Sequence, residues 1–208
     1  MENQQGTRAQ QTRERLRAAA HRLFLRQGYL ATSVDAILAE AGISSKETLY
    51  RHYANKEALF ADVLGHLTLA QPGFSERVAS TSPSPHDLSS LRQALTQLAR
   101  EILAMMCQPG YLPLVRMIIA ESPRFPQLGT LFFSTVTERG MGMLTSLLSE
   151  AHQQGIVADV DFDAVTHALL GGLLTYGMMN LVLAEEVNLV SLDRADAVVD
   201  VLMPALTP

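Results

Sequence analysis

Residues 32–56 read TSVDAILAEAGISSKETLYRHYANK and decide the fold of this chain. Apolar residues recur at helical spacing from Val34 to Ala41, which predicts a short amphipathic helix. Gly42 then ends that helix, because glycine adopts left-handed backbone angles at low cost. A second short helix follows directly, so the stretch has the form of a helix-turn-helix. In this motif the second helix enters the major groove of DNA and flanking groups hold phosphates.

Both helices carry capping residues at their starts. Thr32 and Asp35 have the spacing of a capping box, so we expect the first helix to begin at Thr32. Ser44 or Ser45 can cap the second helix, whose buried side carries Leu49. The outward side of the second helix is polar and basic, which suits contact with DNA.

The residues in and around this motif resemble the TetR family of bacterial one-component transcriptional repressors. The resemblance runs from about Thr12 to Leu64. It rests on four segments in order: F-x-x-x-G-Y at 24–29, T-S-V at 32–34, A-G-I-S at 41–44 and T-L-Y-x-H-Y-x-x-K-E at 48–57. Each segment alone is weak, whereas all four at these intervals are specific. The rest of the chain resembles the family only in length and helical character.

The pattern of apolar residues and helix breakers predicts an all-α protein of about nine or ten helices. No segment pairs β-branched alternation with turn signals, so we expect no strand. The predicted helices lie at about residues 12–27, 32–41, 46–50, 55–70, 88–106, 111–121, 127–154, 162–184 and 192–203. The apolar pattern at 162–184 implies burial on more than one face of that helix.

The resemblance implies two domains. A three-helix DNA-binding domain spans residues 1–60, and residues 1–10 form a flexible arm at its start. A helical ligand-binding and dimerisation domain spans residues 61–208. In the family, the helix that starts here near Asn55 connects the two domains.

The net charge of −5 at first argues against DNA binding, but the distribution of charge reverses that inference. Residues 1–60 hold nine Lys or Arg and six Asp or Glu, an excess of +3. Residues 61–208 hold seven and fifteen, an excess of −8. The basic excess therefore lies on the segment with the motif. Four arginines could follow a phosphate backbone, although a solvated helix face has the same composition: Arg8, Arg13, Arg15 and Arg17.

Several features are typical of a cytoplasmic protein. No apolar run approaches the ~20 residues that span a bilayer. The polar N-terminus, MENQQGTRAQQTRER, is not a secretory signal. Cys107 is the single cysteine, so an intrachain disulfide is excluded. Its place beside Met105 and Met106 favours a small buried core residue over a redox sensor.

We expect the second helix of the motif and its edges to contact DNA. The predicted DNA-binding residues are Thr32, Ser33, Ser44, Ser45, Lys46, Thr48, Tyr50, His52 and Lys56. Among them, Ser45, Lys46 and Thr48 are placed for base edges or nearby phosphates.

The resemblance implies further roles in DNA binding. Tyr50 matches a family tyrosine that contacts the DNA backbone or a thymine methyl group. Thr32 matches a residue that caps its helix and touches phosphate, and His52 and Lys56 match phosphate contacts. Tyr53, in contrast, we expect to pack inside the small domain.

The resemblance also implies a ligand pocket in the middle helices. Flexible apolar side chains suit such a lining, and we expect it to include Met105, Met106, Met117, Phe132, Phe133, Met141, Leu144, Tyr176 and Met179. A stripe of Met or Phe is also typical of a plain core. The charged candidates in this zone are few, namely Arg116, Glu121, Glu138 and Arg139. We therefore expect an apolar or aromatic inducer.

High specificity for DNA requires two copies of the motif, because one copy offers few contacts. Dimers read half-sites about one helical turn, ~34 Å, apart or a multiple of that spacing. We expect a homodimer through residues about 163–203, where the family forms a four-helix bundle. Gly171, Gly172 and Gly177 support close helix packing there, since Gly costs about 1 kcal/mol relative to Ala in a helix. The alternative is an ordinary core helix of a monomer.

The residues do not favour an enzyme, a cofactor or a metal site. The histidines show no H-E-x-x-H or paired Cys/His spacing, and we find no phosphate-binding Gly-rich loop or nucleophile elbow. Asp159, Asp161 and Asp163 mimic the start of a calcium loop, but the later ligand positions do not fit. We expect Asp161 or Asp163 to cap the next helix instead.

Taken together, these patterns predict a ligand-responsive repressor that binds a palindromic operator as a dimer and is released by a small, mostly apolar molecule. Two alternatives stay open. One is a DNA-binding activator or DNA-organising protein without a ligand. The other, more remote, is a helical enzyme or carrier.

Overall fold

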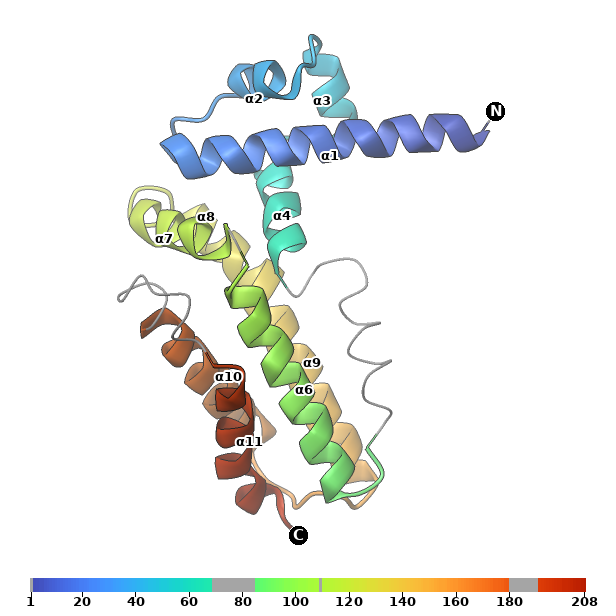
Figure 1. Ribbon diagram of the computed structural model, residues 1–208, viewed down its shortest axis with the longest axis vertical. Helices are drawn as coiled ribbons and strands as arrows, with labels where there is room; N and C mark the ends of the chain where they lie inside the picture. Colours follow the sequence, from blue (N-terminus) through green and yellow to red (C-terminus); the bar gives the residue numbers. More distant parts are fainter. Residues whose placement is uncertain (1, 69–84, 109, 180–190) are drawn as a thin grey trace. The chain divides into compact units, whose positions relative to one another are not determined.

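The computed structural model describes residues 2–68, 85–108, 110–179 and 191–208. Its helices, labelled in Figure 1, are α1 (Glu2–Gln27), α2 (Val34–Ala41), α3 (Lys46–His52), α4 (Lys56–Leu67), α6 (Leu88–Met106), α7 (Tyr111–Glu121), α8 (Pro126–Phe132), η1 (Phe133–Thr137), α9 (Glu138–Gln153), α10 (Phe162–Gly177) and α11 (Asp193–Leu206). These residues contain no strand, and the predicted all-α fold is confirmed. The predicted helix ends near residues 70 and 184 lie outside the described residues.

The described residues fall into two compact units of helices. The first unit is drawn from residues 1–66 and 113–135, and the second from residues 67–112 and 136–208. The segment 113–135 therefore packs with the N-terminal helices, although it lies far from them along the chain. A division at residue 60 into a DNA-binding and a ligand-binding domain stays a prediction.

In the first unit, α1 packs against α2, and α2 packs against α3 (Figure 1). Left-handed glycines end two of these helices: Gly28 follows α1 with φ +83°, and Gly42, as predicted, follows α2 with φ +65°. Asn55 caps α4, because its side-chain oxygen accepts a hydrogen bond from the Ala58 N–H at 2.7 Å. The helix-turn-helix thus follows from signals that act within one turn of the chain.

The core of the first unit is aromatic. Phe24, Tyr29 and Phe60 are each at most 1% exposed, and their ring centroids lie 5.0–5.3 Å apart. Phe125, from the segment 113–135, adds a fourth ring 5.5 Å from Tyr29. Rings at these separations stabilise a fold beyond the apolar area that they bury. Helix α1, the turn after it, α4 and the distant segment therefore share one core.

The start of α2 differs from the prediction. Ser33 is the N-cap, and its hydroxyl accepts a hydrogen bond from the Ala36 N–H at 3.1 Å. Thr32 is buried and donates its hydroxyl to the carbonyl oxygen of Gly28 at 2.7 Å. The predicted capping box at Thr32 is wrong, because Thr32 belongs to the turn that follows Gly28. Ser45 occupies the N-cap position of α3 without a side-chain cap hydrogen bond.

Two helical segments have other bounds than predicted. Helix α1 begins at Glu2 rather than Thr12, because the first residues are mostly good helix formers without proline and extending a helix is easier than starting one. The predicted helix 127–154 is divided by a π-helical segment, Phe133–Thr137, whose buried side chain is Val136. A π segment accommodates an extra residue per turn, which the apolar spacing alone does not reveal.

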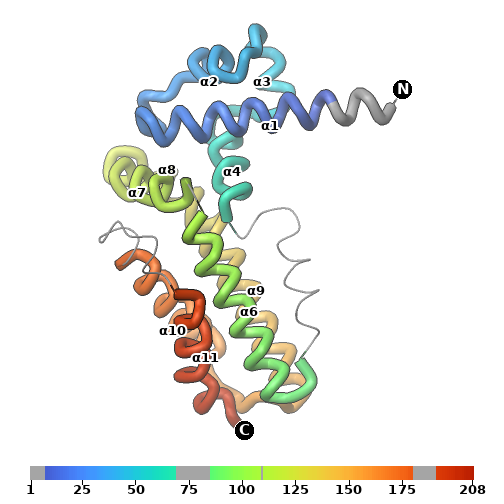
Figure 2. The backbone as a smooth tube through the Cα atoms, viewed as in Figure 1, coloured from blue at the N-terminus to red at the C-terminus, as the bar shows by residue number. Residues whose placement is uncertain are grey.

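In the second unit, α6 contacts α10 and α11, and α10 also contacts α9 and α11 (Figure 2). Helices α6 and α7 have the predicted bounds. A capping box at Asp87 begins α6. Two ion pairs join α6 to α11: Arg92 to Asp200 at 2.6 Å and Arg100 to Asp196 at 2.7 Å. Opposite charges therefore link α6 and α11 in the second unit.

Helix α10 buries one face. Its start is capped by Asp161, as predicted, whose carboxylate accepts a hydrogen bond from the Ala164 N–H at 3.0 Å. The buried residues are Thr166, Leu169, Leu173 and Gly177, and exposed residues on other sides include Ala168, Gly171, Gly172, Leu174 and Thr175. Burial on more than one face is therefore not observed, because the second face is open among the described residues of one chain.

Among the described residues, no single helix is both long enough and apolar enough to cross a membrane. Helices α6 and α7 reach that length and composition only together, as a pair bent by 75°. The apolar face of α6 is buried in the second unit.

Two neighbouring leucines of α9 test the placement of this core. Leu148 is fully buried, whereas Leu147 is partly exposed. We expect Leu148→Ala to lower the free energy of unfolding by about 2–5 kcal/mol, because it leaves a cavity. Leu147→Ala should lower it by roughly 1 kcal/mol or less. Chemical denaturation of both variants checks this, and equal losses would contradict the described register of α9.

Candidate nucleic-acid interface and apolar groove

Helices α2 and α3 present a polar and basic surface. Leu49 is fully buried and anchors α3 to the core of the first unit. Lys46, Tyr50 and Arg51 are exposed on the other side of α3, and the Tyr50 side chain is 52% exposed.

Lys46 on α3 forms an ion pair with Asp35 on α2. Its ammonium lies 2.8 Å and 3.0 Å from the two carboxylate oxygens of Asp35. This hydrogen bond is the main reason why the pKa of Lys46 is raised above its ordinary value. Both side chains are exposed, so the pair itself adds little stability. The charge of Lys46 is nevertheless partly matched before any DNA arrives.

The predicted DNA-binding residues fall into two groups. One group lies at the start of α2, in the turn and on α3, where every side chain is at least partly exposed: Ser33, Ser44, Ser45, Lys46, Thr48, Tyr50 and His52. The other group, Thr32 and Lys56, supports the turn that precedes α2. Contact with DNA stays a prediction for all nine residues.

Lys56 is turned toward the backbone of the same unit. Its ammonium donates hydrogen bonds to the carbonyl oxygens of Tyr29 and Thr32, both at 2.9 Å. It also lies 4.2 Å from the centroid of the Tyr29 ring, a cation–π contact. Burial lowers the pKa of Lys56, and the carboxylates of Glu57 and Glu121 oppose that shift. Lys56 therefore has a structural role, which the sequence did not indicate.

Asp62 on α4 gathers three partners. It lies 2.6 Å from the guanidinium of Arg13 and 3.6 Å from that of Arg17, and it accepts a hydrogen bond from the Tyr53 hydroxyl at 2.7 Å. Tyr53 is buried, so its predicted packing role is confirmed. Arg15 donates hydrogen bonds to the carbonyl oxygens of Ala41 and Gly42 at 2.6 Å and 3.0 Å. These three arginines of α1 are therefore paired inside the unit.

Glu121, the last residue of α7, lies in the first unit and contacts the turn after α1. The sequence places it among the few charged candidates of the predicted ligand-pocket zone. Its carboxylate instead accepts hydrogen bonds from the N–H groups of Tyr29 at 3.1 Å and Leu30 at 3.0 Å. No signal in the local sequence could reveal this pairing, because the partners are 91 and 92 residues apart along the chain.

The residues predicted to bind a ligand are divided between the two units. Met117, Phe132 and Phe133 belong to the first unit, and the other six belong to the second. Within the second unit Met105, Met106 and Leu144 are buried in the core. The described residues thus bring only part of the predicted set together.

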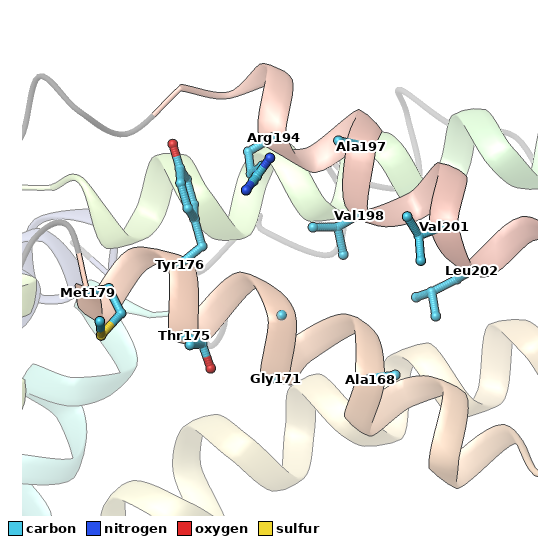
Figure 3. Close-up of a pocket in the computed structure, with 11 residues that line it drawn as sticks. Ala168, Gly171, Thr175, Tyr176, Met179, Arg194, Ala197, Val198, Val201 and Leu202 are labelled. Atoms are coloured by element: carbon cyan, nitrogen blue, oxygen red, sulfur yellow. The ribbon is translucent and has the colours of Figure 1, made fainter.

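Helices α10 and α11 line an open groove with a volume of about 780 Å³ (Figure 3). The lining residues are Ala168, Gly171, Gly172, Thr175, Tyr176, Met179, Arg194, Ala197, Val198, Val201 and Leu202. Two predicted ligand-binding residues, Tyr176 and Met179, lie here. Val201 and Met179 are 78% and 57% exposed, so the groove presents apolar side chains to solvent.

A short exposed helix that Leu49 anchors and that packs with α2, which in turn packs against α1, defines a helix-turn-helix DNA-binding regulator. Residues 16–63 match the family described as bacterial regulatory proteins, tetR family. Residues 93–203 match the family described as AefR-like transcriptional repressor, C-terminal domain. The chain belongs to the TetR family, as its sequence predicted. It is a DNA-binding transcriptional regulator and not an enzyme.

Individual relatives agree over most of the chain. The HTH-type transcriptional regulator UidR of Escherichia coli K12 is 31% identical over 190 residues, which cover 89% of this chain and 88% of that protein. The structure of the flavonoid-responsive regulator FrrA is 30% identical, with a TM-score of 0.69 and coverage of 95% and 97%. Salmonella enterica GusR is 25% identical, with a TM-score of 0.59 and coverage of 94% and 95%.

The two tyrosines of the motif should separate structure from surface. Tyr53→Phe removes the hydroxyl that donates a hydrogen bond to Asp62. We therefore expect this substitution to lower the free energy of unfolding by about 1.5 kcal/mol. Tyr50→Phe removes an exposed hydroxyl and should change the free energy of unfolding by less than about 0.5 kcal/mol. Denaturation of the two variants in parallel measures both values. A larger loss at Tyr50 would contradict the described positions.

Proposed function

We propose that the chain is a ligand-responsive repressor that binds a palindromic operator as a homodimer and is released by a small, mostly apolar or aromatic molecule. The observation that carries the proposal is the exposed face of α3, where Lys46 and Tyr50 project from a helix that Leu49 anchors. The families that match both parts of the chain support control of transcription. The protein acts in the cytoplasm, where its DNA lies.

In the proposed complex, α3 enters the major groove. Lys46 and Thr48 reach base edges or nearby phosphates, and Tyr50 contacts the backbone or a thymine methyl group. The surrounding serines and His52 contact phosphates. Thr32 and Lys56 contribute by holding the turn before α2, and a phosphate contact by Lys56 remains part of the proposal.

The proposed dimer forms through residues about 163–203. The open groove of α10 and α11 supports it, because small residues such as Gly171 and Gly172 allow a second helix to approach closely. Val201 and Met179 offer apolar area that a partner can bury. Two copies would place two α3 helices at two half-sites, which is how a palindrome is read.

The proposed ligand is apolar or aromatic. The methionines of the middle helices support a permissive site. The name of FrrA describes it as flavonoid-responsive, which favours an aromatic molecule here too. Release from DNA requires that the ligand prefers a dimer conformation that does not fit the operator, and by linkage DNA prefers the other conformation. An activator or a DNA-organising protein without a ligand is the alternative.

Substitutions on α3 test the DNA-binding part. We expect Lys46→Ala and Tyr50→Ala each to weaken binding to a selected operator by roughly tenfold to a hundredfold, because each removes a base or phosphate contact. Fluorescence anisotropy at fixed salt measures this, and footprinting should protect two half-sites. Arg139→Ala on α9 removes one positive charge elsewhere and serves as the control. Losses as large for the control would contradict a role of the α3 surface.

A charge placed in the groove tests the dimer. We expect Val201→Glu to raise the dimer dissociation constant by at least about tenfold, because a carboxylate would be buried without a partner. Ile119→Glu makes the same change at an exposed apolar position on α7 outside the groove. Sedimentation equilibrium of both variants checks the prediction. An intact Val201→Glu dimer would argue against the groove as the interface.

A further inference from the structure

The turn between α1 and α2 is held by two opposite charges. The carboxylate of Glu121 accepts the N–H groups of Tyr29 and Leu30 at 3.1 Å and 3.0 Å. The ammonium of Lys56 donates to the carbonyl oxygens of Tyr29 and Thr32 at 2.9 Å. Hydrogen bonds to charged groups are stronger than those between neutral groups. Two charged side chains therefore bind backbone N–H groups and backbone carbonyl oxygens of the same short turn.

The backbone at Gly28 is shaped to receive Glu121. Gly28 has φ +83°, a conformation that side chains disfavour. A Cβ atom at this position would also collide with a carboxylate oxygen of Glu121. The ring of Phe125, four residues after Glu121, lies 5.5 Å from the buried Tyr29 ring. The segment 113–135 thus meets the turn with one charged contact and one aromatic contact.

By sequence, Glu121 belongs to the regulatory part of the chain. It is the last residue of α7 and lies within residues 93–203, which match the C-terminal domain family. By packing, it belongs to the unit that carries the helix-turn-helix. The turn it holds leads directly into the N-cap of α2, Ser33. A residue of the regulatory sequence therefore fixes the start of the DNA-reading motif.

We propose that Glu121 is a positioning residue for specific DNA binding, because its carboxylate fixes the turn that leads into α2 and α3. The inference rests on the proposed function of the motif. With the carboxylate in place, the turn has one conformation and α3 is presented ready to read. Without it, the N–H groups of Tyr29 and Leu30 lose their acceptor and the turn populates other conformations. The apparent affinity for the operator then falls in proportion to the fraction of molecules whose turn keeps the binding conformation.

Specific and non-specific DNA binding should respond differently. Specific binding requires α3 to fit the base edges, so it depends on the orientation of the motif. Non-specific binding depends on the number of phosphates neutralised and tolerates a range of orientations. A positioning residue therefore changes the ratio of the two affinities. A residue that only stabilises the fold lowers both together.

The test uses the full-length protein with Glu121→Ala and Glu121→Gln. Glu150→Ala and Glu150→Gln, at an exposed position on α9, match the loss of charge. Anisotropy at one salt concentration gives the affinity for a selected operator and for a scrambled duplex. Hydrogen exchange reports the Tyr29 and Leu30 amides. We expect Glu121→Ala to weaken operator binding about tenfold and to leave scrambled binding at the level of its Glu150 control.

Glu121→Gln should lose less than Glu121→Ala, because the amide oxygen still accepts one hydrogen bond. Amide exchange at Leu30 should accelerate in the same order. Operator affinity equal to that of the Glu150 variants would overturn the inference, even with faster exchange. Equal losses for operator and scrambled DNA would also overturn it, in favour of a general loss of folding. Failure of the unmodified chain to bind any selected sequence would instead remove the proposed function itself, before any variant is compared.

Discussion

The DNA-binding unit depends on the contacts of the buried residue Tyr29. Its ring meets Phe24 of α1 and Phe60 of α4 at centroid distances of 5.3 Å and 5.0 Å. Its backbone lies between the charges of Lys56 and Glu121. One residue in a turn therefore contacts two helices, one positively charged side chain and one negatively charged side chain.

Local signals in the sequence predicted the elements well. Gly42 ends its helix and Asp161 caps the next one, as predicted, and Gly28 and Asn55 act on the backbone within one turn in the same way. Spacing of apolar residues also gave the bounds of α6 and α7. Such signals are complete in a short window of sequence, so no tertiary contact is needed to interpret them. The misplaced cap at Thr32 shows the limit, because Ser33 competes for the same role one residue later.

Long-range pairings could not be predicted in this way. The charge of Arg13 suits either phosphate contact or a solvated face, yet its partner Asp62 lies 49 positions away on α4. Glu121 is a charged candidate of the predicted pocket zone, yet it holds a turn 91 residues earlier. Charge alone does not say which of many partners a side chain meets. The excess of +3 in residues 1–60 also omits Asp62, which pairs with Arg13 and Arg17 of that segment.

The pair of Lys46 and Asp35 has a consequence for how DNA binding responds to salt. A lysine that reaches a phosphate from water gains one partner, and one condensed counterion leaves the DNA. In the proposed complex with DNA, Lys46 would first give up a carboxylate at 2.8 Å, which would then face the polyanion. The free energy that Lys46 would contribute to DNA binding is therefore the difference between its pair with phosphate and its pair with Asp35. That difference weakens less steeply with ionic strength than a lysine–phosphate pair alone. In that complex Asp35 would lie close to α3 and would repel every sequence to which Lys46 offers no compensating contact.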